Sequence, residues 1–275
     1  MTSAATDNGY DPLDDFQMES MTYGDLTYAV YRSGSGPAVV VMPEMPGITP
    51  SVADFARKVR DRGLTVFVPS LFGTPGKPPS PGYIINSLAK GCIAKEFTAL
   101  ATNRPSPVTA WLTALARDAH AACGGPGVGT VGMCFTGSFA LAMATDPSVV
   151  APVASQPSLP LGLTPGRMRA TGLTDEEAKI VVARAQSENL CAIGLRFTGD
   201  PAVKAQRFDS LRSLLGENFI SVELDSSKGN QGNNRKGAHS VLTEDLQPIA
   251  GHPTQQALDD VLNFLAERLL PANGS

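Results

Sequence analysis

Short apolar runs alternate with helical patterns along most of the chain, and this alternation constrains the fold more than any other feature. The first run, 37–42, is almost continuously apolar, which is typical of a strand buried on both faces. Similar runs rich in β-branched residues follow at 64–68, 128–133, 149–154, 192–198 and 219–224. Strands that alternate with helices predict the α/β class, with a mostly parallel sheet and helices on both sides.

The predicted helices have start and stop signals. Ser51 is a candidate N-cap for the helix after the first run, and Gly63 a candidate stop. Thr174-Asp-Glu-Glu177 is a capping box that predicts a helix to about residue 187. Apolar spacing predicts further helices over 108–122 and 136–144 and a last one that ends before Pro271.

We predict a single large domain over residues 21–271. Residues 1–20 are acidic and lack the basic region and apolar core of a signal peptide, so we expect a disordered N-terminal tail. Residues 157–190 are expected to form either a lid over the site or one more crossover helix. A polar stretch rich in Gly, Asn and Ser, 226–237, leads directly to His239.

Composition disfavours several classes of function. The net charge of −4 disfavours a nucleic-acid-binding protein, which needs a basic patch. The sequence contains no run of about 18 apolar residues, so we predict no membrane span. The four cysteines fit neither a zinc template nor a C-x-x-C pair, and without a secretion signal we expect no disulfides and a cytoplasmic location. We expect no metal and no organic cofactor, and the oligomeric state stays open.

Cys134 lies where a nucleophile would be expected. Gly132-Met-Cys-Phe-Thr-Gly137 joins a predicted strand to a predicted helix, and such a sharp turn projects its central side chain above the sheet. The nucleophile pattern is G-x-[SC]-x-G, however, and Thr136 stands where the second glycine belongs. Cys134 is therefore either a nucleophile or a buried structural thiol.

The candidate base is His239, because it follows the last predicted strand and precedes the last helix. His120 and His252 lie at helix boundaries, where capping or surface roles are the simpler interpretation. Asp200 follows the run 192–198 and is the candidate acid, with an Asp-Pro turn as the alternative interpretation. Asp225 is a second candidate acid, closer to the histidine than this chain order expects.

The loop Pro43-Glu-Met-Pro-Gly47 follows the first run. A loop at this place can donate one backbone N–H to an oxyanion hole, and the residue after the nucleophile donates the other. We assign these donors to Met45 and Phe135. Glu44 then lies near Cys134, unless it is an ordinary solvated carboxylate.

Together these segments resemble the dienelactone hydrolase family of the α/β-hydrolase superfamily over roughly residues 25–270. The turn at Cys134 resembles the family's G-x-C-x-G-G, and the loop at Glu44 resembles its glutamate-bearing oxyanion loop. Gly199-Asp200 resembles the site of its acid, and Ala238-His239-Ser240 its G-H-S.

The resemblance implies an α/β-hydrolase fold and a Cys-His-Asp triad that hydrolyses carboxylic esters or lactones. It also implies that Glu44 contacts the resting thiol and helps to deprotonate it. Better-known members hold a substrate carboxylate with arginines, one of them four residues past the histidine, where this chain has Thr243. Arg104 is a candidate anchor or a surface arginine, and with Ser240 it completes the predicted substrate-binding residues.

We therefore predict a carboxylesterase or lactonase of the dienelactone hydrolase type, whose partner is a small ester or lactone and whose substrate need not be dienelactone. The alternative is a catalytically silent scaffold that binds a small molecule, which Thr136 and Thr243 motivate. A thiol redox sensor is a third hypothesis, although no second cysteine is placed as a resolving partner.

Overall fold

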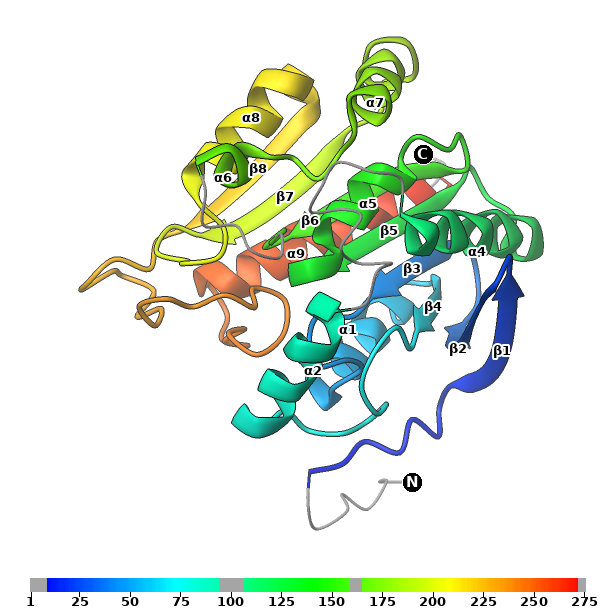
Figure 1. Cartoon of the computed structure of the whole chain (residues 1–275), viewed down its shortest axis with the longest axis horizontal. Helices are drawn as coiled ribbons and strands as arrows, with labels where there is room; N and C mark the ends of the chain where they lie inside the picture. The colour runs from blue at the N-terminus through cyan, green and yellow to red at the C-terminus, as the bar shows by residue number, and fades with distance from the viewer. Residues whose placement is uncertain (1–8, 94–105, 159–164, 272–275) are drawn as a thin grey trace.

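A computed structural model describes residues 9–93, 106–158 and 165–271. Within these residues, eight strands form one sheet in the order β1-β2-β4-β3-β5-β6-β7-β8 (Figure 1). β2 pairs antiparallel with β1 and β4, and all other neighbours are parallel. The strands are β1 Gln17–Tyr23, β2 Leu26–Gly34, β3 Ala38–Met42, β4 Thr65–Pro69, β5 Val128–Met133, β6 Val149–Ser155, β7 Ala192–Phe197 and β8 Phe219–Leu224.

Helices cover both faces of this sheet (Figure 1). Alternate residues of β3 show the division: Val39 and Val41 pack with α1 and α9, whereas Val40 and Met42 pack with α4 and α5. A central strand buried on both faces must be apolar throughout, which explains the continuous run. The described helices are α1 Pro50–Arg60, α2 Pro81–Ile93, α4 Pro107–Cys123, α5 Gly137–Met143, α6 Pro165–Arg169, α7 Asp175–Glu188, α8 Ala205–Leu215 and α9 Pro253–Leu269.

The predicted α/β class is confirmed, and most predicted elements lie within two residues of their observed bounds. The N-cap of α1 is a correction. Thr49, and not Ser51, caps this helix, because its hydroxyl accepts the N–H of Val52 at 3.3 Å while Pro50 occupies the first helical turn.

The prediction of a disordered tail over residues 1–20 is wrong for the part that the structure describes. Residues 17–20 belong to β1, and Leu13 and Phe16 are buried in the core beside α1. Asp11 and Asp15 both pair with Arg57, at 2.6 and 2.7 Å. The hydrogen bond from Arg57 helps to lower the pKa of Asp15 to about 2. The acidic residues therefore anchor the segment to α1.

The part of residues 157–190 that the structure describes contains a crossover helix. α7 connects β6 to β7, and its capping box at Thr174 and Glu177 forms as predicted. The buried Arg184 of α7 donates to the carbonyl oxygens of Ala144 and Val149, at 2.7 and 3.0 Å. These bonds hold α7 against the core, so α7 is not a lid.

Candidate active site

Cys134 lies at the sharp turn between β5 and α5, in the short helical turn Cys134–Thr136. Its φ angle is 54°, in the left-handed region that non-glycine residues rarely adopt. The neighbouring backbone packs closely: a Cβ atom at Gly132 would lie 2.2 Å from the Thr136 carbonyl oxygen, and one at Gly137 would lie 2.8 Å from Cα of Pro157. Small residues are therefore needed on both sides, as a nucleophile elbow requires.

Thr136, which departs from the elbow pattern, has a defined structural role. Its buried hydroxyl accepts the N–H of Met133 at 2.9 Å and can donate to the Met42 carbonyl oxygen at 3.0 Å. It also lies within reach of the carbonyl oxygens of Met133 and Pro43. The threonine therefore fits the turn and connects it to the carboxyl end of β3.

Replacing this hydroxyl by a methyl group should destabilise the fold. We expect Thr136→Val to cost about 1–3 kcal/mol of unfolding free energy, because the Met133 N–H would be left buried without its acceptor. Thr136→Ser should recover most of the loss. Chemical denaturation measures both. Thr113→Val is the matched control, since its hydroxyl bonds only a carbonyl of its own helix; an equal loss there would contradict the role of Thr136.

His239 and Asp200 meet at the carboxyl edge of the sheet. Nδ1 of His239 lies 2.7 Å from Oδ2 of Asp200, whose side chain is fully buried. The other oxygen of Asp200 accepts the N–H of Ala202 at 2.7 Å, which fixes the carboxylate. Asp225 is exposed and accepts from the N–H of Ser227, so it does not take this place.

Cys134 and Asp200 both act on the His239 imidazole. Burial lowers the pKa of His239, but the negative charge of Cys134 and the hydrogen bonds with Asp200 and Cys134 raise it more. The net result is a pKa well above the ordinary value. With Nδ1 on Asp200, the Nε2 side of the ring is left for the sulfur. The three residues thus form one electrostatic unit.

Asp245 holds the histidine loop and was not found from the sequence. Its Oδ2 accepts the backbone N–H groups of His239 and Ser240, at 2.8 and 3.1 Å. Arg235 pairs with the same carboxylate at 2.9 Å. A carboxylate six residues after a histidine carries no pattern of its own, so only the folded loop identifies it.

Glu44 is buried, but its contacts differ from those that we expected. Ser240 donates to its Oε2 at 2.6 Å, Gln156 donates to the same oxygen at 3.2 Å, and Thr243 bonds Oε1. Among the described residues, none of the hydrogen bonds of Glu44 goes to Cys134. The expected contact with the thiol is thus replaced by contacts with the histidine loop. Burial raises the pKa of Glu44, and the hydroxyl donors offset only part of that.

The hydroxyl of Ser158 lies next to the Cys134 sulfur. Its Oγ lies 3.2 Å from Sγ of Cys134, and its N–H donates to the Cys134 carbonyl oxygen at 2.9 Å. The buried Arg207 of α8 donates to the carbonyl oxygen of Pro157, directly before this serine. A serine 24 residues after the cysteine gives no sequence signal, because its position depends on how β6 ends beside the elbow.

The remaining predicted residues have simple positions. Met45 lies in the loop after β3 and Phe135 directly after Cys134, so the oxyanion hole stays a prediction. Arg104 lies outside the described residues. His252 caps α9, and His120 lies in the last turn of α4, which agrees with structural roles for both.

In the described part of the chain, no group of three or more His, Cys, Asp or Glu residues could hold a metal ion, and no helix is long and apolar enough to span a bilayer.

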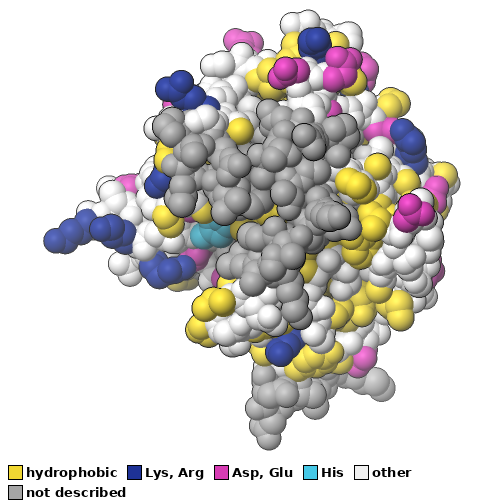
Figure 2. Space-filling model, in the orientation of Figure 1, with side chains coloured by type: hydrophobic (Ala, Val, Ile, Leu, Met, Phe, Trp, Pro, Cys, Tyr) yellow, Lys and Arg dark blue, Asp and Glu magenta, His cyan; other side chains and the backbone are white. Residues whose placement is uncertain are grey.

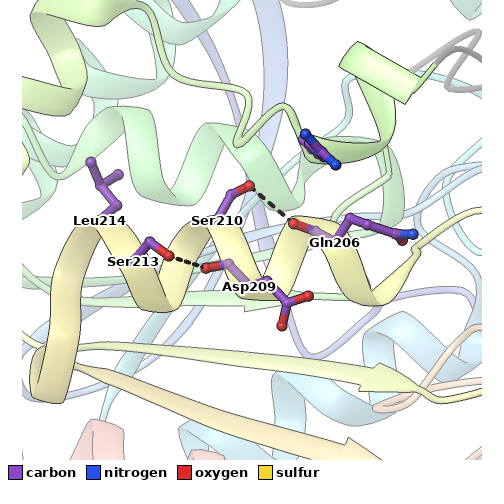
Figure 3. A pocket seen from close by; sticks show the side chains of 6 residues that line it. Gln206, Asp209, Ser210, Ser213 and Leu214 are labelled. Carbon is purple, nitrogen blue, oxygen red and sulfur yellow. Dashed lines mark hydrogen bonds between the residues drawn. The ribbon is translucent and has the colours of Figure 1, made fainter.

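A separate pocket of about 510 Å³ lies between α6 and α8, remote from this chemistry (Figure 3). Ser210 and Ser213 on its wall donate to carbonyl oxygens of their own helix, at 3.0 and 2.8 Å. These two hydroxyls are thus used within α8. On the face shown in Figure 2, several Lys and Arg side chains gather on the projection at the left, and the other coloured ones lie singly.

Comparisons with known proteins concern the family and the fold of the chain. The model of the dienelactone hydrolase family matches residues 26–231. A comparison with curated proteins finds no match. Many solved structures are similar. One of them is a protein of Klebsiella pneumoniae subsp. pneumoniae, provisionally named a dienelactone hydrolase. It is 16% identical to this chain with a TM-score of 0.61, and the match covers 92% of this chain and 98% of that one.

Two further structures come from metagenomic libraries. A dienelactone hydrolase-like promiscuous phosphotriesterase is 18% identical with a TM-score of 0.55, over 92% of this chain and 98% of that one. A cold-adapted esterase from an Arctic intertidal library is 13% identical with a TM-score of 0.56, over 92% and 93%. At these identities the structures establish the fold alone, while the family model covers most of the chain. The chain therefore belongs to the dienelactone hydrolase family, with its α/β-hydrolase fold, and this membership supports a hydrolase.

Proposed function

We propose that this protein hydrolyses a small carboxylic ester or lactone through a thioester on Cys134. The observation that carries the proposal is the 2.7 Å bond between His239 and Asp200 beside a cysteine at φ 54°. An imidazole held by a buried carboxylate can take a proton from the thiol and return it to a leaving group. Family membership and esterases of the same fold support the same class of reaction.

The reaction proceeds in two halves. The Cys134 sulfur attacks the acyl carbon, and the carbonyl electrons move to an oxyanion that accepts from the N–H groups of Met45 and Phe135. The C–O bond then breaks, and the leaving oxygen takes a proton from His239. Water next attacks the thioester while His239 accepts its proton. The C–S bond breaks, the acid is released, and the sulfur and imidazole regain their starting state. A lactone keeps its alcohol within the released hydroxy acid.

Thr243 favours an uncharged substrate. Its hydroxyl is bonded to Glu44, so this position holds Glu44 and supplies no cation for a substrate carboxylate. Ser240 is likewise bonded to Glu44, which argues against its predicted role in binding substrate. The cytoplasmic location stays a prediction.

Hydrolysis of three compounds tests the proposal: p-nitrophenyl acetate, an uncharged lactone and a dienelactone that carries a carboxylate. We expect turnover of the first two compounds and a lower kcat/KM for the dienelactone. Residue 243 is a threonine, so it supplies no positive charge to offset that of the dienelactone carboxylate. Binding of the uncharged compounds without turnover of any would contradict the proposal and support the silent scaffold.

A further inference from the structure

The surroundings of the Cys134 sulfur differ from those that the sequence suggests. Ser158 approaches it from the end of β6, with Oγ 3.2 Å from Sγ, and the same serine bonds the Cys134 carbonyl oxygen through its N–H. Ser158 is thus attached twice to the nucleophile residue. It is only 8% exposed, so little solvent competes for its hydroxyl.

Glu44 is occupied elsewhere. Its two oxygens receive bonds from Ser240, Thr243 and Gln156, on the histidine loop and at the end of β6. A carboxylate with these partners would have to lose buried hydrogen bonds in order to turn toward the sulfur. Each such loss would leave a buried donor without its acceptor, which is costly. Glu44 therefore positions the loop that carries His239.

The backbone at Ser158 is fixed from two sides. Arg207 donates to the carbonyl oxygen of Pro157, and Pro157 packs against Gly137 so closely that a Cβ atom at that glycine would clash. Gln156, at φ 36°, bonds the Leu195 carbonyl oxygen through its N–H at 2.7 Å. These contacts fix the serine at one place beside the elbow and leave its hydroxyl free to rotate toward the sulfur.

We propose that Ser158, in place of Glu44, is the hydrogen-bond partner that holds the Cys134 sulfur as a thiolate in the resting protein. The thiol proton passes to Nε2 of His239, which leaves a thiolate and an imidazolium, and Ser158 donates its O–H to the sulfur. Such a bond to an ion is stronger than one to a neutral thiol, so it favours the charged form. The sulfur loses its charge when the thioester forms, and the bond weakens.

The other charged groups around the sulfur are consistent with this state. His239 and its partner Asp200 lie on one side, and Arg207 lies behind Ser158, close enough to Asp200 for their charges to interact. Glu44 bonds Ser240, Thr243 and Gln156, and its charge interacts with that of His239. This inference rests on the proposed role of Cys134 as nucleophile, but it concerns ionisation of the thiol and can be measured without an ester substrate.

The test is the rate at which iodoacetamide alkylates Cys134 as a function of pH, with the modified peptide identified by mass spectrometry. We expect Ser158→Ala to move the pH profile of alkylation upward, because the thiolate loses the hydrogen bond that the Ser158 hydroxyl donates. Alkylation at neutral pH then slows. Ser158→Thr, which keeps the hydroxyl, should retain most of the wild-type profile, and Ser187→Ala on the exposed face of α7 is the control.

Glu44→Gln decides between the two partners. We expect it to shift the alkylation profile less than Ser158→Ala does, because Glu44 acts on the sulfur only through His239 and the loop that carries it. A shift in Glu44→Gln that equals or exceeds that of Ser158→Ala would overturn the proposal, as would a wild-type profile in Ser158→Ala. If Ser158→Ala does not fold, Ser158→Gly supplies the same comparison. Because no ester is used, a normal result here together with absent ester hydrolysis would reject the proposed function and keep this inference.

Discussion

The Cys134→Ala variant should lose ester hydrolysis almost completely, with kcat/KM falling at least about a thousandfold. Without the sulfur no thioester can form, and the oxyanion donors and His239 are left to assist direct attack by water. Removing a nucleophile that acts with a base as one unit costs about as much as removing the whole set. The measurement is kcat/KM for p-nitrophenyl acetate in purified variant and wild type.

Cys191→Ala is the matched control for this variant. Cys191 is a partly exposed free thiol that precedes β7, at the opposite end of that strand from Asp200. We expect the control to keep wild-type kcat/KM and its unfolding midpoint. Retention of activity in Cys134→Ala would eliminate Cys134 as the nucleophile.

The Asp200→Asn variant should lower kcat by about three to four orders of magnitude while the fold persists. An asparagine can present its NH₂ group to Nδ1, which selects the wrong tautomer of His239 and removes the charge that stabilises the imidazolium. The hydrogen bond with Asp200 helps to raise the pKa of His239, so its loss should lower that pKa. The pH dependence of kcat/KM therefore provides a second readout.

The same variant has a predictable effect on stability. The folded-state pKa of His239 is raised, so its contribution is fully present below the unfolded value of about 6.5 and is lost as pH rises through the folded pKa. The part of the stability loss in Asp200→Asn that comes from His239 should thus be largest below about pH 6.5. Asp225→Asn, at an exposed carboxylate, should change neither kcat nor this pH dependence. If Asp200→Asn kept the full wild-type kcat, Asp200 would be excluded as the acid.

Central strands were predicted well because burial on both faces leaves a continuous apolar run. β5, which is buried throughout, has the predicted bounds. β8 also has the predicted bounds, although it is an edge strand and only partly buried. The outer pair β1 and β2 was missed because β1 is largely exposed and carries little apolar signal. The ordered structure of residues 9–16 was missed for another reason: Leu13 and Phe16 are isolated apolar residues, and the pairing of Asp11 with Arg57 of α1 gives no sequence signal.

For the site, the positions of the main residues could be predicted from the sequence, but their hydrogen-bond partners could not. The chain order of nucleophile, acid and histidine places Cys134, Asp200 and His239 at the ends of parallel strands, and the structure brings them together there. Which neighbour bonds which is decided by packing. Among the described residues, the hydrogen bonds of Glu44 go to Thr243, Ser240 and Gln156 and not to the thiol. Ser158 reaches the sulfur only because β6 ends beside the elbow.

The central claim is that the acyl group passes through a thioester on Cys134, and acid quenching during turnover tests it most directly. Protein mixed with p-nitrophenyl acetate is denatured within the first turnovers, digested and analysed by mass spectrometry. We expect an acetyl group on the peptide that contains Cys134, removable by neutral hydroxylamine as a thioester is. An acetyl group on Ser158 instead, or steady turnover with no acetylated Cys134 peptide at any quench time, would contradict it.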